Sequence, residues 1–272
     1  MRKMPQMICA LGDLLLDVIV RLDGPIAEDT DTYGQTKVGA GGQAANVAAW
    51  VASLGGPARL VGKRARDGAG RLVLAELETR DVEVKGPEVD AGTGTVVSIA
   101  TPDGRRTMLS DRGVAPDLHA DELRDEWFDG CERLHLPAYS VLAPPIRDAA
   151  GAAARLVPRV SLDLSSTAAI QAAGVEELHA AVSRLQPDVV FANEDEAALA
   201  GELEAETLVI KRGARGCLVR TRGEEREYEA LPARVVDSTG AGDAFAAGFL
   251  LGGPQLALKA AARCVASMGA MP

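Results

Sequence analysis

Residues 237–249, which read DSTGAGDAFAAGF, place a short run of small residues directly before a carboxylate. Gly240, Ala241 and Gly242 precede Asp243, and a run of small and apolar helix-forming residues follows. The first N–H groups of a helix have no partner inside it, and the helix N-terminus carries about half a positive charge. We therefore expect the backbone of this turn to bind an anion such as a phosphate group.

Asp243 would repel a bound phosphate, so a carboxylate at this position needs a separate reason. A proton acceptor is required when a hydroxyl group attacks phosphorus, and the helix N-terminus is expected to keep Asp243 ionised for that role. Alternatively, Asp243 only caps the helix, which is a common use of aspartate. The residue types and their spacing leave both interpretations open.

Two more groups of polar residues lie near the N-terminus. Asp13 and Asp17 interrupt an apolar, β-prone run, and on a single strand they would face the same side. Gly41 and Gly42 begin the stretch GGQAANVA, where a ligand can approach the backbone closely, and Asn46 follows one turn later. Carboxylates accept hydrogen bonds from vicinal hydroxyl groups, so both groups are candidates for binding a sugar. A turn cap for one of the acids is the alternative, and a double glycine is weak evidence on its own.

Together these motifs resemble the ribokinase-like (PfkB-type) carbohydrate kinases, and the resemblance runs in order from Gly12 to Ala270. DSTGAGDAFAAGF is similar to the C-terminal signature of that family, GDLLLD to its first-strand motif and GGQAAN to its N-terminal signature. The resemblance implies that Asp243 is the catalytic base and that Gly240, Ala241 and Gly242 form the anion hole. It implies that the acceptor sugar is bound by Asp13, Asp17, Gly41, Gly42 and Asn46.

Two later motifs resemble those that hold the nucleotide and metal in the family. Asn193 and Glu196 match its NxxE motif, which is associated with Mg²⁺ and phosphate, although the same pair also predicts a helix N-cap with a capping box. The run KRGARG resembles the nucleotide turn TxGxxG, with a lysine in place of the threonine. The resemblance implies nucleotide contacts from Asn193, Lys211, Gly213 and Gly216, and Mg²⁺ held through water by Glu196. Asp237 and Thr239 match positions that bind a monovalent cation such as K⁺ in some relatives.

The resemblance implies an ATP-dependent kinase that transfers the γ-phosphate to a primary hydroxyl of a sugar or sugar-like substrate, with ATP and Mg²⁺ as cofactors. A nucleoside kinase of the same fold is an alternative, which the 3% aromatic content disfavours slightly because base stacking uses aromatic side chains. A non-catalytic ligand-binding or regulatory protein is the other alternative. The sequence contains no GxxxxGK[ST], HExxH or GxSxG motif, which argues against P-loop, zinc-protease and serine-hydrolase chemistry.

The elements that would position these residues indicate a single α/β domain over 1–272. From Cys131 onward strand-like runs alternate with alanine-rich helical stretches, which predicts parallel βαβ units. Residues 233–236, ARVV, predict a further strand before the glycine turn. The resemblance implies a ribokinase-like central, mostly parallel sheet flanked by helices. It also implies a small β-sheet lid from excursions at about 21–39 and 93–110, the second turning at Pro102-Asp103-Gly104. Lid strands often pair between subunits in the family, which allows a homodimer.

Composition and charge describe a globular protein with a small-molecule ligand. The net charge of −10 and the lack of a basic block argue against nucleic acid as a partner. No run is long and apolar enough to cross a membrane, and residues 1–5 lack the apolar stretch of a signal peptide. The four cysteines form no CxxC pair, so we expect them to be reduced. These observations predict a cytoplasmic location.

Overall fold

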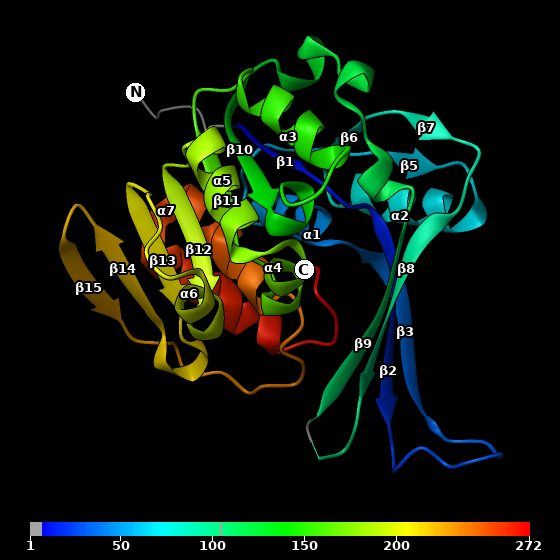
Figure 1. Cartoon of the computed structure of the whole chain (residues 1–272). Coiled ribbons are helices and arrows are strands. Elements are labelled where there is room, and N and C mark those ends of the chain that lie inside the picture. The colour runs from blue at the N-terminus through cyan, green and yellow to red at the C-terminus, as the bar shows by residue number, and fades with distance from the viewer. Residues whose placement is uncertain (1–6, 104) are drawn as a thin grey trace.

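Two β-sheets organise the chain in the computed structural model, which describes residues 7–103 and 105–272 (Figure 1). The larger sheet has nine strands in the order β15-β14-β13-β12-β11-β10-β1-β4-β6. From β6 across to β13 all neighbours pair in parallel, and β14 and β15 continue antiparallel. The strands are β1 (Met7–Leu11), β4 (Ala58–Val61), β6 (Val82–Lys85), β10 (Cys131–Pro137), β11 (Val160–Asp163), β12 (Val189–Asn193), β13 (Thr207–Lys211), β14 (Cys217–Thr221) and β15 (Glu224–Tyr228). The predicted central, mostly parallel sheet is confirmed.

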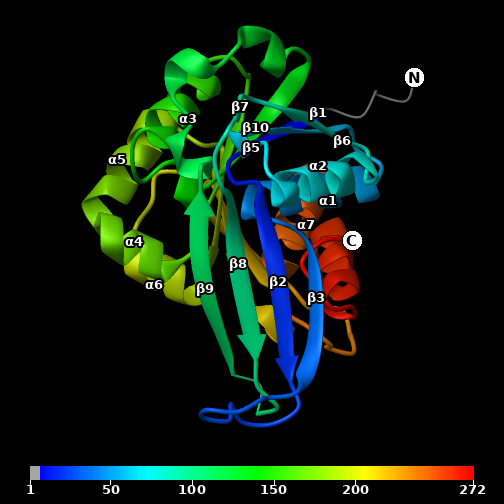
Figure 2. The same ribbon diagram turned by 90° about the vertical axis from the view of Figure 1, so that its right-hand side faces the viewer.

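Helices cover both faces of this sheet (Figure 2). One face carries α1 (Gln43–Ser53), α2 (Gly68–Glu78) and α7 (Ala241–Val265), and the other carries α3 (Ile146–Ala154), α4 (Thr167–Ala173), α5 (Val175–Leu185) and α6 (Glu194–Ala200). Each layer buries its own apolar cluster against the sheet. Alternating strands and helices therefore form the doubly covered α/β sheet that the repeating pattern predicts. No helix in the described residues is both long and apolar enough to span a membrane.

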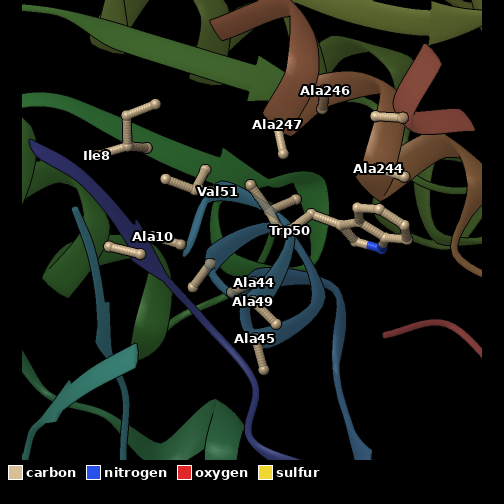
Figure 3. Packing of buried hydrophobic residues seen from close by; sticks show 14 of the residues in the cluster. Ile8, Ala10, Ala44, Ala45, Ala49, Trp50, Val51, Ala244, Ala246 and Ala247 are labelled. Atoms are coloured by element: carbon tan, nitrogen blue, oxygen red, sulfur yellow. The ribbon is translucent and has the colours of Figure 1, made fainter. Parts of the chain in front are cut away.

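Helix α1 packs against α7 and β1 in one alanine-rich cluster (Figure 3). Ala247 of α7 points toward Trp50 and Val51 of α1, and all three residues are buried. Trp50 is the large member of this cluster, and its indole N–H donates to the Ala270 carbonyl oxygen at 2.8 Å. The first turn of α1 is thereby fixed beside the first turn of α7, and the C-terminal segment is tied to both.

A second, smaller sheet projects from the main body (Figure 1). Its order is β3-β2-β8-β9, with β2 antiparallel to β3 and parallel to β8, and β8 antiparallel to β9. Its strands are β2 (Leu15–Leu22), β3 (Gly34–Gly41), β8 (Thr93–Ala100) and β9 (Arg106–Gly113), so it extends beyond the excursions predicted at 21–39 and 93–110. Gly104 of the predicted hairpin turn lies outside the described residues. A two-stranded parallel ribbon pairs β5 (Arg64–Ala65) with β7 (Glu88–Val89) near α2 (Figure 1).

Three expectations about local structure are wrong. Asp13 and Asp17 do not share a strand, because the chain leaves the large sheet after β1 and Asp17 lies in β2 of the small one. Residues 233–236 form no strand: the Val236 N–H donates to the Val265 carbonyl oxygen at 2.7 Å, which holds this segment at the end of α7 rather than on a sheet edge. Cys9 and Cys131 form a disulfide, since β1 and β10 are neighbours in the sheet, whereas Cys217 and Cys264 are free and buried.

The turn before α7 provides a test of how the C-terminal segment is held. Gly240 has φ = 76°, and an added Cβ would lie 2.5 Å from the Cα of Ala270. Gly130 has φ = 74° and open space around it, so it is a matched control. We expect Gly130→Ala to lower the free energy of unfolding by about 1–2 kcal/mol from the left-handed backbone alone. Gly240→Ala should lower it further, because the segment must also shift. Equal losses in urea unfolding would show that this packing contributes no measurable stability.

Candidate active site

Two adjoining cavities lie at the carboxyl ends of β11, β12 and β13. One, of about 460 Å³, is lined by polar and charged side chains from both sheets, and the other, of about 590 Å³, is mostly apolar. We call them the polar cavity and the apolar cavity. Both are lined by Lys211, Gly213, Ser238 and Gly242, so these four residues mark the place where the cavities meet. Ligand sites at the carboxyl ends of strands are the rule in open parallel sheets.

Most of the residues predicted for the site lie together here. The polar cavity is lined by Asp13, Asp17, Gly42, Asn46, Asn193, Glu196, Lys211, Gly213, Thr239, Gly240, Gly242 and Asp243. Ala241 and Gly216 line the apolar cavity. Gly41 and Asp237 line neither, and both act on neighbouring groups as described below.

The N-terminus of α7 opens at the junction of the two cavities. Gly240 is its N-cap, with a left-handed backbone, and its carbonyl oxygen accepts from the Ala244 N–H at 2.9 Å. The Ala241 N–H donates to the Ser238 carbonyl oxygen at 3.3 Å, so it is already engaged. The N–H groups of Gly242 and Asp243 are therefore the ones that the helix leaves for a bound anion.

Asp243 is held by Asn46, whose side-chain amide donates to its Oδ2 at 2.8 Å. Burial raises the pKa of Asp243 to about 7, against the effect of this hydrogen bond, and the charge of Asp163 raises it further. Burial therefore opposes the ionisation that the helix N-terminus is expected to favour. A carboxyl group that titrates near neutrality suits a proton acceptor.

Asp17 and the double glycine form one packed unit. An added Cβ at Gly41 would lie 2.1 Å from Cγ of Asp17, and one at Gly42 would lie 2.3 Å from the Asp13 carbonyl oxygen. The atoms that approach these two glycines are thus those of the two acids. Burial raises the pKa of Asp17 to about 7. Gly41 contributes to the cavity by making room for Asp17.

Strand β9 closes the polar cavity with one of its faces. Arg106, Met108, Ser110 and Arg112 alternate along the strand and all line the cavity. Arg112 binds Asp13 through two hydrogen bonds, both of 2.7 Å.

The other end of β9 reaches the turn before α7, where Arg106 donates to the hydroxyl of Thr239 at 2.6 Å. Ser110 and Tyr139 carry no motif, and sequence analysis missed them. Ser110 reaches the cavity because it lies on the same face of β9 as Arg106 and Arg112, and Tyr139 reaches it from the turn that follows β10.

Asn193 and Glu196 form the capping box that the sequence allowed as an alternative. The Asn193 side chain accepts from the Glu196 N–H, and the Glu196 carboxylate accepts from the Asn193 N–H, each at 2.8 Å. Burial and the charge of Asp163 raise the pKa of Glu196. Both residues still line the polar cavity, so capping α6 and facing a ligand are compatible.

Lys211 and Asp163 form an ion pair beneath the junction. Lys211 Nζ lies 2.7 Å from Asp163 Oδ2, and Asp163 is fully buried. The other Asp163 oxygen accepts from the Ser165 N–H at 3.0 Å, so this carboxylate also caps the loop after β11. Asp163 carries no motif, and the fold is what brings it to the lysine.

Asp237 and the two nucleotide-turn glycines shape the surrounding backbone. Asp237 accepts from the N–H groups of Thr239 and Gly269 at 2.9 and 3.0 Å, and from the Thr239 hydroxyl at 2.6 Å. Gly213 lies at the junction, and an added Cβ at Gly216 would lie 1.9 Å from the Tyr228 carbonyl oxygen. Asp237 therefore fixes the turn before α7, and Gly216 allows the turn after β13 to pack on β15.

The charged residues suit Mg²⁺ that is held mainly by phosphate and water. Within residues 7–103 and 105–272, no group of three or more His, Cys, Asp or Glu side chains is arranged to hold a metal by itself. Mg²⁺ usually keeps several waters and takes one or two carboxylates together with substrate phosphates. Glu196, on the wall of the polar cavity, fits that sparse arrangement.

The pKa values of the two aspartates in the glycine turn are shifted in opposite directions, so the two residues change stability differently with pH. Burial raises the pKa of Asp243, whereas at Asp237 hydrogen bonds from Thr239 and Gly269 outweigh burial and lower the pKa. Below about pH 4 both carboxyls are protonated in the unfolded chain. As the pH rises from 4 to 8, wild type loses stability at Asp243, since the unfolded chain releases its proton first. The stability contributed by Asp237 is nearly complete at pH 4 and is lost only as the pH falls through its lowered folded-state pKa.

Urea unfolding of Asp243→Asn and Asp237→Asn at pH 4 and pH 8 tests this prediction. Relative to wild type, Asp243→Asn should gain about 1–3 kcal/mol of unfolding free energy between the two pH values. Asp237→Asn should show no comparable gain over this interval, because Asp237 is mostly ionised in both the folded and the unfolded chain above pH 4, and so it serves as the matched control. A gain of similar size in both variants would contradict the assigned environments.

Comparisons with known proteins identify the family. The profile described as pfkB family carbohydrate kinase matches residues 5–271. The chain is 29% identical over 266 residues to a fructokinase of Escherichia coli, covering 90% of this chain and 83% of the relative. It is 29% identical over 255 residues to an ATP-dependent ribose-1-phosphate kinase of Halopiger xanaduensis, covering 89% and 83%.

Solved structures share the fold. The adenosine kinase from Sinorhizobium meliloti superposes with a TM-score of 0.89 at 24% identity, covering 99% of this chain and 96% of that one. The ribokinase-like fold expected from the motifs is therefore confirmed. With the family profile spanning nearly the whole chain, the protein belongs to the pfkB family of carbohydrate kinases and is an ATP-dependent kinase of that family.

Proposed function

We propose that the protein transfers the γ-phosphate of ATP to a primary hydroxyl of a sugar or sugar-like substrate, with Asp243 as the general base. The observation that carries this proposal is the position of Asp243 and the α7 N-terminus at the meeting point of a polar and an apolar cavity. A phosphoryl group transferred between ligands in the two cavities would pass next to the free N–H groups of Gly242 and Asp243. These dipoles stabilise the negative charge on the transferring group.

The acceptor occupies the polar cavity. The side-chain oxygen of Asn46 is buried and has no hydrogen-bond partner among the described residues, which is costly unless a ligand supplies a donor. Its amide group already binds Asp243, so a hydroxyl that donates to Asn46 is brought next to the base. Asp17 and Gly42 line the same wall, and Asp13 holds Arg112 across from them. The two sequence relatives are named for a sugar and a sugar phosphate, which favours a sugar, whereas the adenosine kinase of the same fold keeps a nucleoside as the alternative.

ATP occupies the apolar cavity with its phosphates at the junction. Leu231, Pro232, Leu258 and Val265 provide an apolar surface that suits an adenine ring, and Gly213 and Gly216 leave the backbone open to the phosphates. Asn193 and Lys211 lie on the phosphate side. Glu196 would hold Mg²⁺ through water, and the ion when bound neutralises charge on the β- and γ-phosphates.

Three finer features are proposed with the function. The Asp237 carboxylate and the Thr239 carbonyl oxygen are proposed to bind a monovalent cation such as K⁺, and an assay with and without K⁺ tests this.

The protein is proposed to act in the cytoplasm as one domain over 1–272. A homodimer through the small sheet is supported by the exposed apolar side chains of Val38 and Leu109, and sedimentation of the purified protein tests it.

Replacing the base tests the mechanism. Asp243→Asn should lower kcat by about 10²–10⁴, because the acceptor hydroxyl loses its proton acceptor, while ATP affinity is retained. ADP release is measured with Mg·ATP against a panel of sugars, sugar phosphates, sugar acids and nucleosides. Asp148→Asn, at an exposed carboxylate of α3, is the control and should match wild type.

The panel also separates the alternatives. A hit only among nucleosides would replace the sugar by a nucleoside acceptor. ATP binding without turnover on any compound would favour a regulatory protein. Full activity of Asp243→Asn would exclude the proposed mechanism.

Blocking each cavity separately tests which ligand it holds. Ala261 lines only the apolar cavity, and Ser110 lines only the polar one. Ala261→Phe should raise KM for ATP by about tenfold or more and leave KM for the acceptor within twofold, since an added ring fills space that the ligand needs. Ser110→Phe should have the reverse effect. The two variants control for each other, and exchanged effects would show that the ligand assignment is wrong.

A further inference from the structure

Lys211 is the one cation among the four residues that line both cavities. It ends β13, next to Asn193 in the register of β12 and β13, and its side chain is only 17% exposed. Its Nζ lies directly over the first turn of α7, because an added Cβ at Gly242 would be 3.3 Å from it. The ammonium group and the free N–H groups of that turn therefore face the same small volume.

Carboxylates surround this ammonium group and keep it charged. Burial alone would lower the pKa of Lys211, but the charges of Asp163, Glu196 and Asp243 raise it. Asp163 is the closest of them and is itself fixed by the Ser165 N–H, so it can move little. A buried lysine that serves only to pair Asp163 would not have to line either cavity. This one lies on the path between them, where the related nucleotide turn has a threonine.

We propose that Lys211 is a catalytic residue whose ammonium group contacts the phosphoryl group during transfer, and that Asp163 is a positioning residue that holds it there. The proposal rests on the proposed kinase function. The bond between the γ-phosphorus and the bridging oxygen of ATP breaks as the acceptor oxygen bonds to phosphorus. The acceptor proton passes to Asp243, and ADP leaves. Lys211 keeps its proton throughout and stabilises the negative charge on the phosphoryl oxygens.

Separating this role from a structural one requires a double variant. Lys211→Met leaves the Asp163 carboxylate buried without its partner, which is destabilising. Lys211→Met with Asp163→Asn removes both charges and should restore much of the lost stability. Lys63 is the matched control: it is 12% exposed, pairs with Glu122 at 2.7 Å and lines neither cavity.

Urea unfolding and steady-state kinetics are measured on these three variants and on Asp163→Asn alone. We expect kcat of Lys211→Met to fall by about 10²–10³, with a smaller rise in KM for ATP, as for the loss of other groups that stabilise transition-state charge. In the double variant, kcat should remain low although stability returns. Lys63→Met should lose stability and keep its kcat. Asp163→Asn alone should lower kcat about tenfold, because Lys211 keeps its positive charge but loses the carboxylate that holds it in position.

Two results would overturn the proposal. If kcat recovers together with stability in the double variant, Lys211 serves only to neutralise Asp163. If Lys211→Met stays within threefold of wild type, its ammonium group does not contact the transferring group. Failure of the kinase function itself looks different, since wild type would then be inactive on every acceptor.

Discussion

The close packing of α1 against α7 is the constraint on which the site depends. Alanines at the interface let the two helices approach until Asn46, in the first turn of α1, reaches Asp243 in the first turn of α7. The hydrogen bond between them joins the acceptor wall to the base. A larger side chain at Ala247, which points from α7 toward α1, would separate the helices and break this hydrogen bond. Trp50 extends the same constraint to the C-terminal segment through Ala270.

Burial of acids at the edge of the large sheet is the second organising feature. Asp17, Asp163, Glu196 and Asp243 converge on one cavity, and of these only Asp163 is directly paired with a cation, Lys211. Loss of hydration raises the pKa of the unpaired members, to about 7 for Asp17 and Asp243. Such a cluster is costly for folding but suits a site that must accept a proton and bind a highly charged nucleotide with its metal.

The small sheet completes the polar cavity through opposite charges. Arg112 and Arg106 stand at the two ends of one face of β9, and they contact Asp13 and Thr239 of the main body. The strand between them supplies Met108 and Ser110 to the cavity. Because side chains alternate between the two faces of a strand, one face of β9 forms the outer wall of the acceptor site. The Arg106 contact is exposed and can exchange for a contact to a ligand at little cost, whereas Arg112 is held firmly by the buried Asp13.

The sequence by itself determined the large α/β sheet, the glycine turn before Asp243 and the capping box at Asn193. Each of these depends on neighbours within a few residues: the alternation of strands and helices, a left-handed glycine, or a side chain bonding to its own helix end. The grouping of distant motifs into one site followed from the family resemblance, which assigns them to one acceptor and one nucleotide. Residues without a motif, such as Ser110 and Tyr139, gave no such signal.

Only the tertiary structure decided the features that depend on distant segments meeting. The raised pKa of Asp243 comes from burial, which local sequence does not report. The Cys9–Cys131 disulfide needs β1 beside β10, and the separation of Asp13 from Asp17 needs two sheets. The place of Lys211 at the junction of two cavities arises from β13, α7 and their partners together. Each of these features is set by packing between distant segments, which the spacing of residues along the chain does not reveal.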